Sequence, residues 1–385
     1  MVVYVTQQGA EVVREGRHLL VRKGDTIYHT LFTYKLEQLI LCGRVGVTTP
    51  ALQLLMREEI DTVFLRFDGR YCGRLASAEP KNVFVRKRQF ELADDAAFCL
   101  RQARAIIDGK LRNMQTVLQR IARTRRGVDL SAPLRALKEG LASLERTEDL
   151  QQVRGIEGAG AAAYFSGLRL GLEDDFGFVR RVRRPPTDPV NAVLSLLYTL
   201  LINRLYAAVR LAGLDPYPGV LHSLDYGRQA LPLDLVEEFR ASLADTLALA
   251  LFNRKVLKRD DFEIHRPEPL DLPEPAPMPV DAAVTDPLGR MSNLDAEDAF
   301  DLPAQELGRG DVPDEDTLEQ RLPVRLTHEA FRRVIEAFEK KLQTEFFHPL
   351  AEQRMTYAEA LVWQARQYRR VIQGEQQVYQ PLLLR

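Results

Sequence analysis

The spacing of apolar residues changes once along this chain, near residue 90, and the change divides the chain into two kinds of structure. Short β-prone runs separated by turn residues come first, and apolar residues at helical spacing follow. Strands and helices are therefore segregated, whereas β-α-β units of a parallel sheet would alternate them. We expect an α+β fold, with a small N-terminal β domain over residues 1–80 and a larger all-α domain from residue 81 onwards.

The first 80 residues predict strands and one short helix. Thr49 suits the N-cap of that helix and Pro50 its first position. Asp68–Gly69 is a two-residue signal for a hairpin turn. The expected strands are Val2–Val5, Glu11–Val13, Leu19–Val21, Thr26–Tyr28, Asp61–Phe67 and Arg70–Leu75.

The remainder of the chain predicts helices. A long amphipathic stretch begins at Phe98 and continues past Gly109 to Ile121. Prolines at 185, 186 and 189 forbid a continuous helix between two later segments. The further expected helices are Leu130–Leu144, Ile156–Leu168, Asn191–Leu211, Leu233–Asn253, Thr327–Gln343 and Tyr357–Gln373.

One segment, residues 266–320, differs from the rest in composition. It holds nine of the 21 prolines and 15 acidic residues against three arginines. Such a segment buries too little apolar surface to offset its ordering entropy, so we predict a flexible insertion that divides the helical domain into 81–265 and 321–385. The rest of the chain then carries 50 basic and 39 acidic residues, which favours an anionic partner such as nucleic acid.

The cysteines and the apolar runs indicate the cellular location of the chain. Cys42, Cys72 and Cys99 form no CxxC pair and no disulfide framework. The N-terminus lacks the features of a signal peptide. The longest apolar stretch, near 192–202, is shorter than the ~18 residues of a membrane span. We expect a cytoplasmic protein with no membrane partner.

Glu157 is the first candidate site residue. It precedes Gly158–Ala163, which formally matches a dinucleotide-binding fingerprint but lacks the buried strand that this motif requires. We interpret the run as a helix whose small residues allow close packing. A carboxylate in such a helix needs a partner, either an arginine such as Arg154 or a metal ion.

His222 and the helix that follows it supply further candidates. His222 lies in a loop rich in Pro and Gly, where a histidine is usually a surface residue. Asp234 and Glu237 stand three apart in the first turn of the next helix, where acidic residues also complement the helix dipole. Together with Glu157 they form a mixed N/O set that suits Mg²⁺ or Mn²⁺. The hypothesis is that Glu157, His222 and Glu237 bind one divalent cation.

Basic clusters accompany this candidate metal site. Such clusters are usually solvated helix faces, but a phosphodiester substrate needs cations together with a metal. The arginines suggested as DNA contacts are Arg123, Arg125, Arg126, Arg181, Arg183 and Arg184.

Four ordered blocks resemble the CRISPR adaptation integrase family, the universal first Cas protein (Cas-one). They are RGIEGAGAAAYF, FVRRVRRPPTDPVNAVLSLLYTLL, AGLDPYPGVLHS and ALPLDLVEEFR. The resemblance covers residues 1–262, and the sequence departs from the family pattern after Asp261–Phe262, where the acidic segment is inserted.

The resemblance implies a function and a site. Its members have an N-terminal β domain and an α-helical catalytic domain, form homodimers, and assemble with a small ferredoxin-like partner (Cas-two). They join short foreign DNA fragments into a CRISPR array. The family's metal-binding residues fall on Glu157, His222 and Glu237, and a further acidic position on Asp234. Asn191 and Tyr198 lie in a family helix and are implied either to support the site or to contact DNA.

Two rival functions and one ambiguity of register stay open. A generic metal-dependent nuclease would share the site but only cut DNA, and a non-catalytic DNA-binding module would bind without metal. Helical geometry places Glu237 about 60° and Glu238 about 40° from Asp234, on opposite sides. Family spacing favours Glu237, and Glu238 is expected to contribute only surface charge.

Overall fold

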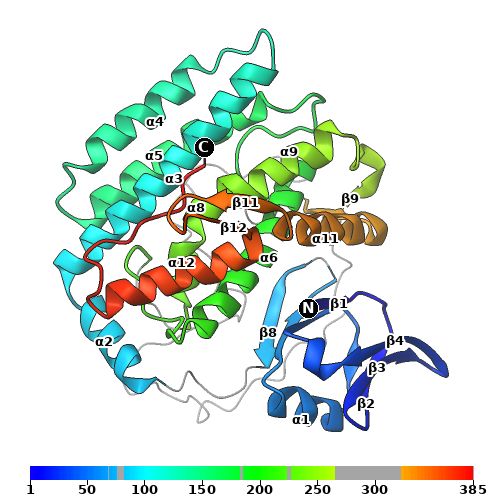
Figure 1. Cartoon of the computed structure of the whole chain (residues 1–385). Coiled ribbons are helices and arrows are strands. Elements are labelled where there is room, and N and C mark those ends of the chain that lie inside the picture. The colour runs from blue at the N-terminus through cyan, green and yellow to red at the C-terminus, as the bar shows by residue number, and fades with distance from the viewer. Residues whose placement is uncertain (68, 76–81, 183–184, 223–226, 265–321, 385) are drawn as a thin grey trace, which may run out of the picture.

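The computed structural model describes residues 1–67, 69–75, 82–182, 185–222, 227–264 and 322–384 (Figure 1). Strands gather at the N-terminal end of the molecule and helices form the larger part beside them. The expected α+β class is confirmed, since a β region is followed by a mostly helical one. The predicted acidic insertion, 266–320, lies outside the described residues, as does Asp68 of the predicted hairpin turn.

Two four-stranded sheets and helix α1 (Thr49–Arg57) make up the N-terminal part. In the first sheet β1, β5 and β7 run parallel and β8 pairs antiparallel with β7. All the predicted strands are present, but β5 and β6 were missed. The five residues of β5 are all buried and show no alternation, and β6 has only two residues. The first sheet contains β1 (Val2–Val5), β5 (Gln38–Cys42), β7 (Asp61–Leu65) and β8 (Tyr71–Leu75), and the second β4 (Thr26–Phe32), β3 (His18–Lys23), β2 (Glu11–Glu15) and β6 (Gly46–Val47).

The helical part follows the predicted periodicity with three differences. Helix α2 was missed, since its apolar residues do not gather on one face and Phe84 is 82% exposed. The helix predicted over 233–253 is interrupted by a π-helical turn at Arg240–Asp245. The helices are α2 (Val83–Ala93), α3 (Ala96–Thr124), α4 (Ser131–Leu144), α5 (Leu150–Arg169), α6 (Pro189–Leu211), α7 (Ala230–Leu235), α8 (Glu237–Phe239), α9 (Thr246–Asn253), α11 (His328–Leu342) and α12 (Tyr357–Ile372).

The third difference is that this part is not wholly helical. Strand β9 (Phe262–Ile264) pairs antiparallel with β10 (Val324–Leu326), so the chain enters and leaves the acidic segment through neighbouring strands. A second hairpin joins β11 (Glu345–His348) to β12 (Gln353–Thr356). These strands are three or four residues long, too short to give a clear alternation in the sequence.

Helix α6 lies at the centre of the helical part. By length and composition it could span a membrane. The apolar stretch identified in the sequence, near 192–202, underestimated the length of this helix. However, 78% of its most apolar window is buried inside the molecule. Burial of this kind is typical of a core helix.

The larger of two hydrophobic clusters among the described residues extends across both parts, and the smaller lies within the N-terminal part. Ile40 and Val63 of the first sheet belong to the same buried cluster as the residues of α6. Arg74 of β8 donates to Asn203 Oδ1 over 3.0 Å, and its guanidinium lies 3.6 Å from the ring centroid of Tyr206. The sheet is thereby held against α6.

Close packing between α3 and α5 builds the floor of the candidate site. A β-carbon at Gly160 would lie 2.5 Å from Leu111 Cδ2, so only glycine allows α5 to approach α3 this closely. The run Gly158–Ala163 lies inside α5 and follows no strand. Its small residues therefore serve helix packing, as the sequence indicated.

Candidate functional site

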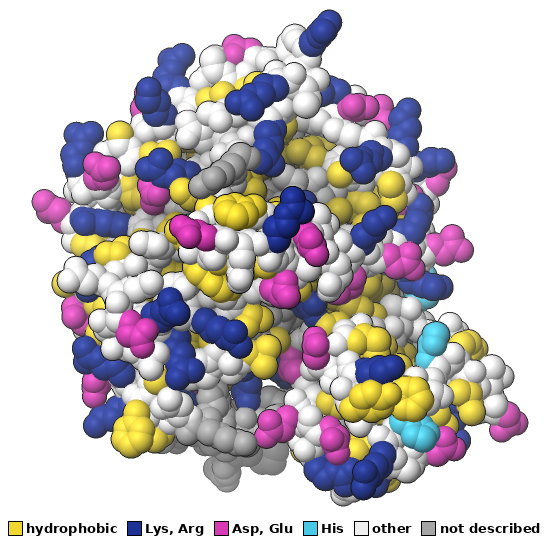
Figure 2. Space-filling view, viewed as in Figure 1, with side chains coloured by type: hydrophobic (Ala, Val, Ile, Leu, Met, Phe, Trp, Pro, Cys, Tyr) yellow, Lys and Arg dark blue, Asp and Glu magenta, His cyan; other side chains and the backbone are white. Residues whose placement is uncertain are grey.

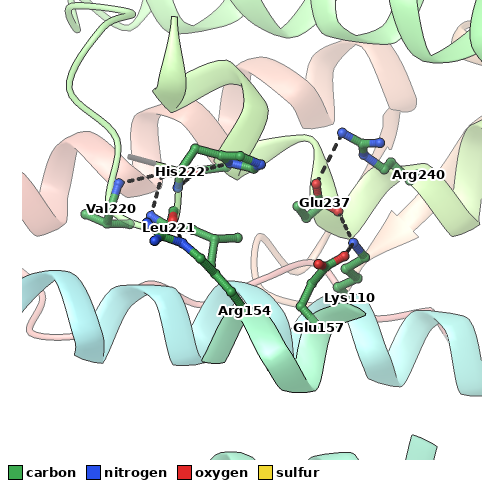
Figure 3. Close-up of polar contacts among 9 residues, drawn as sticks. Lys110, Arg154, Glu157, Val220, Leu221, His222, Glu237 and Arg240 are labelled. Atoms are coloured by element: carbon green, nitrogen blue, oxygen red, sulfur yellow. Dashed lines mark hydrogen bonds and ion pairs between the residues drawn. The ribbon is translucent and has the colours of Figure 1, made fainter. Parts of the chain in front are cut away.

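Glu157, His222 and Glu237 lie in one region, contributed by separate elements (Figure 3), and Asp234 contacts His222 there. Glu157 belongs to α5, Asp234 to α7 and Glu237 to α8, and His222 lies in the loop between α6 and α7. The packing of α3 against both α5 and α8 brings these elements together. Residues separated by 80 positions in the sequence thus face one another.

Asp234 holds the histidine loop in place. Its carboxylate accepts hydrogen bonds from the backbone N–H groups of Val220 (2.5 Å), Leu221 (3.0 Å) and His222 (2.9 Å). A β-carbon at Gly219 would lie 2.6 Å from Asp234 Oδ2, so the loop needs glycine there. Asp234 is fully buried, and both its oxygens are used in these contacts. These contacts make Asp234 a positioning residue of the histidine loop.

The same carboxylate orients the imidazole ring of His222. Asp234 Oδ1 lies 2.6 Å from His222 Nδ1. An ionised carboxylate can only accept a hydrogen bond, which assigns the hydrogen to Nδ1 and, in the neutral ring, leaves the lone pair on Nε2. In Figure 3 the ring points from its loop toward Glu237. His222 is therefore prepared to coordinate a cation or take up a proton through Nε2.

Arg154 does not pair with Glu157, contrary to one of the two expectations. Its Nε donates to the carbonyl oxygen of Leu221 over 2.8 Å, so it supports the histidine loop from α5. The partner of Glu157 is instead Lys110, on α3.

Lys110 was missed in the sequence, although it stands at the centre of the site. Its ammonium pairs with Glu157 Oε1 and lies 2.5 Å from Glu237 Oε2. Only 5% of the lysine side chain is exposed. A signal was present, since Lys110 follows Ile106 and Ile107 at core spacing on the apolar face of α3. A charged residue at such a position needs a buried partner.

Glu237 is surrounded by positive charge. Arg240 Nη2 lies 3.2 Å from its Oε1, opposite the oxygen that faces Lys110. Burial alone would raise the pKa of Glu237, but the charges of Arg240, Lys110 and His222 together hold the pKa of this carboxyl below its ordinary value. Glu237 is ionised at neutral pH.

Glu238 faces the other way, and the expectation that it contributes surface charge was wrong. It is 1% exposed. Tyr379 Oη donates to it over 2.5 Å and Gln364 Nε2 over 3.0 Å, and the backbone N–H of Leu382 donates to it as well. Burial raises the pKa of Glu238 to about 8, although these hydrogen bonds act in the opposite direction. Glu238 anchors the segment after α12.

Asn191 and Tyr198, implied as supporting or DNA-contacting residues, are both buried. Asn191 accepts from Arg181 Nη1 over 2.9 Å. Tyr198 donates to Asp245 Oδ1 over 2.6 Å, and the guanidinium groups of Arg181 and Arg240 lie 5.2 and 4.7 Å from its ring centroid. Neither residue is on the surface, so of the two implied roles their burial favours support of the site over contact with DNA. Through Tyr198 they connect the loop at Arg181 to Arg240, which pairs with Glu237.

The basic clusters divide into structural and exposed arginines. Arg181 also donates to Ser195 Oγ over 3.0 Å, so its guanidinium holds the loop against α6. Arg125 donates to the carbonyl of Leu172 over 3.0 Å at the end of α3. Arg123 and Arg126 are exposed. Arg183 and Arg184 lie outside the described residues. Figure 2 shows Lys and Arg side chains spread over the helical part.

Comparison with known proteins identifies the family. The sequence model of CRISPR associated protein Cas1 matches residues 3–270. The chain belongs to the Cas1 family. A relative named CRISPR-associated endonuclease Cas1 3, from Thermus thermophilus, is 31% identical over 386 residues, which cover all of this chain and 97% of the relative. Membership of Cas1, with relatives named endonucleases, supports a CRISPR-associated nuclease of the endonuclease and integrase type.

Solved structures share the Cas1 fold. A chain of a Cas6-RT-Cas1–Cas2 complex matches with a TM-score of 0.76 at 23% identity, over 99% of this chain and 36% of that one. A casposase bound to an integration product matches with a TM-score of 0.76 at 16% identity, over 98% and 92% of the two chains. The present chain thus spans about a third of the first of these.

The donor set of the site fits a divalent metal ion. In the arrangement seen, no three His, Cys, Asp or Glu side chains among the described residues are close enough to hold one. Instead, the ammonium of Lys110 lies between two of the candidates, Glu157 and Glu237, and pairs with both. Carboxylate oxygens and one imidazole nitrogen suit Mg²⁺ or Mn²⁺. Glu157, Glu237 and His222 are therefore compatible with a metal site.

Proposed function

We propose that this chain is a divalent-metal-dependent DNA integrase and endonuclease of CRISPR adaptation. It joins short DNA fragments to a CRISPR array by attack of a 3′-hydroxyl on a phosphodiester. The observation that carries the proposal is the convergence of Glu157 and Glu237 on the ammonium of Lys110. Beside them lies His222, which the buried carboxylate of Asp234 orients. A generic nuclease and a non-catalytic DNA-binding module are the alternatives.

Different residues of the site bind the metal ion and orient the residues that bind it. Glu157, His222 Nε2 and Glu237 would hold Mg²⁺ or Mn²⁺. The ion, when bound, supplies positive charge at the scissile phosphate and the leaving oxygen. Arg240 and the buried surroundings keep Glu237 ionised and oriented. Asp234 keeps the Nε2 lone pair of His222 available for coordination or for the proton of the attacking hydroxyl.

The proposed joining step balances without an outside source of energy. The oxygen of the attacking 3′-hydroxyl forms a new bond to phosphorus while the bond to the leaving 3′ oxygen breaks. The attacking hydroxyl loses one proton and the leaving oxygen gains one, so one phosphodiester replaces another. Hydrolytic cutting differs only in that water replaces the attacking hydroxyl. One site can therefore do both.

The proposed partners follow from the family and its structural neighbours. Double-stranded DNA is the substrate, as fragment and as CRISPR repeat, and the exposed arginines of the helical part suit its phosphates. We propose that the chain acts in the cytoplasm as a homodimer with the small ferredoxin-like partner Cas2. The complex of Cas1 with Cas2 among the structural neighbours supports this assembly.

A single assay separates the proposed function from its rivals. The chain, its small partner, a short duplex and supercoiled plasmid are incubated with Mn²⁺ or with EDTA. Fragment joined to plasmid only with Mn²⁺ supports the proposal. Cutting without joining indicates the generic nuclease. DNA retardation on a gel with neither product indicates the binding module.

A further inference from the structure

Lys110 deepens the proposed function, because it lies between the two acidic residues assigned to the metal. It is contributed by α3, whereas Glu157 comes from α5 and Glu237 from α8. Its Nζ lies 2.5 Å from Glu237 Oε2 and also pairs with Glu157 (Figure 3). The ammonium thus joins three elements at one point.

The charges of the site are balanced only with Lys110 present. Two ionised carboxylates that share one ammonium repel each other when it is removed, and buried charge without compensation is costly. Arg240 lies 3.2 Å from Glu237 Oε1, on the other side of that carboxylate. The oxygens that face each other across the site, Glu157 Oε1 and Glu237 Oε2, are compensated by Lys110.

A divalent cation needs these same two oxygens. An ammonium and a metal ion repel each other, and they cannot both lie within bonding distance of the same oxygen atoms. Binding of the ion therefore requires that Lys110 move. A lysine has a flexible four-carbon stem, so its ammonium can leave by rotation about side-chain bonds while α3 stays in place.

We propose, on the basis of the metal dependence proposed above, that Lys110 is an exchangeable counter-cation of the metal site. Its ammonium neutralises Glu157 and Glu237 while no divalent ion is bound, and it leaves when Mg²⁺ or Mn²⁺ binds. The lysine keeps the acidic site folded without metal, and in return it weakens the binding of metal by competing for the oxygens.

The test is titration of the full-length chain with Mn²⁺ alone, without DNA, by calorimetry. Lys110→Met removes the competing charge, so the Kd for Mn²⁺ should fall at least ~10-fold. In EDTA the same variant should lose about 5 °C of Tm, because Glu157 and Glu237 lose the cation between them and only Glu237 keeps another partner, Arg240. Saturating Mn²⁺ should raise the Tm of the variant again by most of that difference.

Two further variants make the result specific. Lys110→Gln is neutral but keeps hydrogen-bond donors, and it should show the same tighter binding even if the Met variant folds poorly. Arg112→Met is the matched control on the same helix, since it breaks a half-exposed ion pair with Asp108 at 2.6 Å. It should leave the Kd for Mn²⁺ unchanged. Glu237→Gln should lose the titrated site, which locates the ion.

The outcomes separate this inference from the proposed function. If the wild type binds Mn²⁺ through Glu237 and neither Lys110 variant binds it more tightly, Lys110 is a permanent ion-pair partner and the exchange is wrong. The same holds if Mn²⁺ fails to restore the stability or folding of both variants. If the wild type binds no Mn²⁺ that depends on Glu237, the metal dependence itself fails, and the exchange with it.

Discussion

Glu237 and Glu238 are neighbours in one short helix, are both buried, and have opposite environments. Glu237 faces Lys110 and Arg240, whose charges hold its pKa below the ordinary value. Glu238 faces Tyr379, Gln364 and the backbone of Leu382, with no ion pair, and burial raises its pKa to about 8. Two identical side chains thus differ in charge state because their partners differ.

The difference separates two sides of α8: a chemical side, marked by Glu237, and a structural side, marked by Glu238. On the first, charge is concentrated and compensated, which suits a cation and a phosphate. On the second, hydrogen bonds fasten the segment after α12 to the core, and Asn113 adds bonds to the carbonyls of Glu238 and Leu382, both over 2.8 Å. The segment therefore closes the back of the helix that carries Glu237. The following predictions test this separation, from the largest expected effect to the smallest.

Glu237→Gln should have the largest effect. It keeps the shape of the side chain but removes the charge that attracts a divalent cation. We expect joining and cutting with Mn²⁺ to fall at least ~100-fold, beyond the effect of losing an outer partner of a ligand, while DNA affinity in gel retardation stays the same. Glu238→Gln is the matched control and should stay within about threefold of wild type, since it lies on the other side. Equal losses in both variants would contradict the separation.

Asp234→Asn should cost about 10- to 100-fold in Mn²⁺-dependent activity, as is typical of residues that orient a ligand. The amide can no longer accept from both the imidazole and all three backbone N–H groups of the loop. Initial rates of plasmid cutting at saturating Mn²⁺ measure the effect. A loss as complete as that of Glu237→Gln would mean that Asp234 itself binds the ion.

Much of this arrangement was accessible from the sequence. Apolar periodicity predicted α3, α4, α11 and α12 because each has one buried face at helical spacing, and the apolar run of α6 predicted a helix that is buried nearly all round. Resemblance to a family selected Glu157, His222 and Glu237. Helical geometry alone left Glu237 and Glu238 equivalent. Family spacing favoured Glu237, and in the structure the two differ in their partners, since Tyr379 and Leu382, 141 and 144 positions away, bond to Glu238.

Other features depend on long-range packing that local patterns do not record. Lys110 meets Glu157 across 47 positions, and nothing near either residue specifies the other. The π turn at 240–245 has no signal in residue types, yet it places Asp245 against two tyrosines, where burial raises its pKa to about 6. For Asn191 and Tyr198 the resemblance left support of the site and contact with DNA both open, because a polar residue in a helix gives no indication of its burial.

Glu238→Gln should change how stability depends on pH. The pKa of Glu238 in the folded state, about 8, lies above its ordinary value of 4.5. Between these values the unfolded chain has lost the proton and the folded chain keeps it, so stability is highest below pH 4.5 and falls as pH rises through 8. From pH 6 to 7.5 the wild type should lose roughly 1 kcal/mol per pH unit relative to the variant. Urea unfolding across this range measures the difference, and parallel curves would mean that Glu238 is ionised throughout.

Tyr379→Phe should have the smallest effect and tests whether the two sides of α8 act independently. The variant keeps the buried ring but removes a donor 2.5 Å from Glu238 Oε1, which should cost about 1–2 kcal/mol of unfolding free energy. Because Tyr379 lies behind α8, the Kd for Mn²⁺ and the cutting rate should stay within about twofold of wild type. Tyr368→Phe is the control, since its ring lies 5.9 Å from that of Tyr379 but it does not bond to Glu238. If Tyr379→Phe instead reduces cutting 10-fold while the unfolding free energy is unchanged, the segment after α12 positions Glu237 directly, and the structural side of the helix is part of the site.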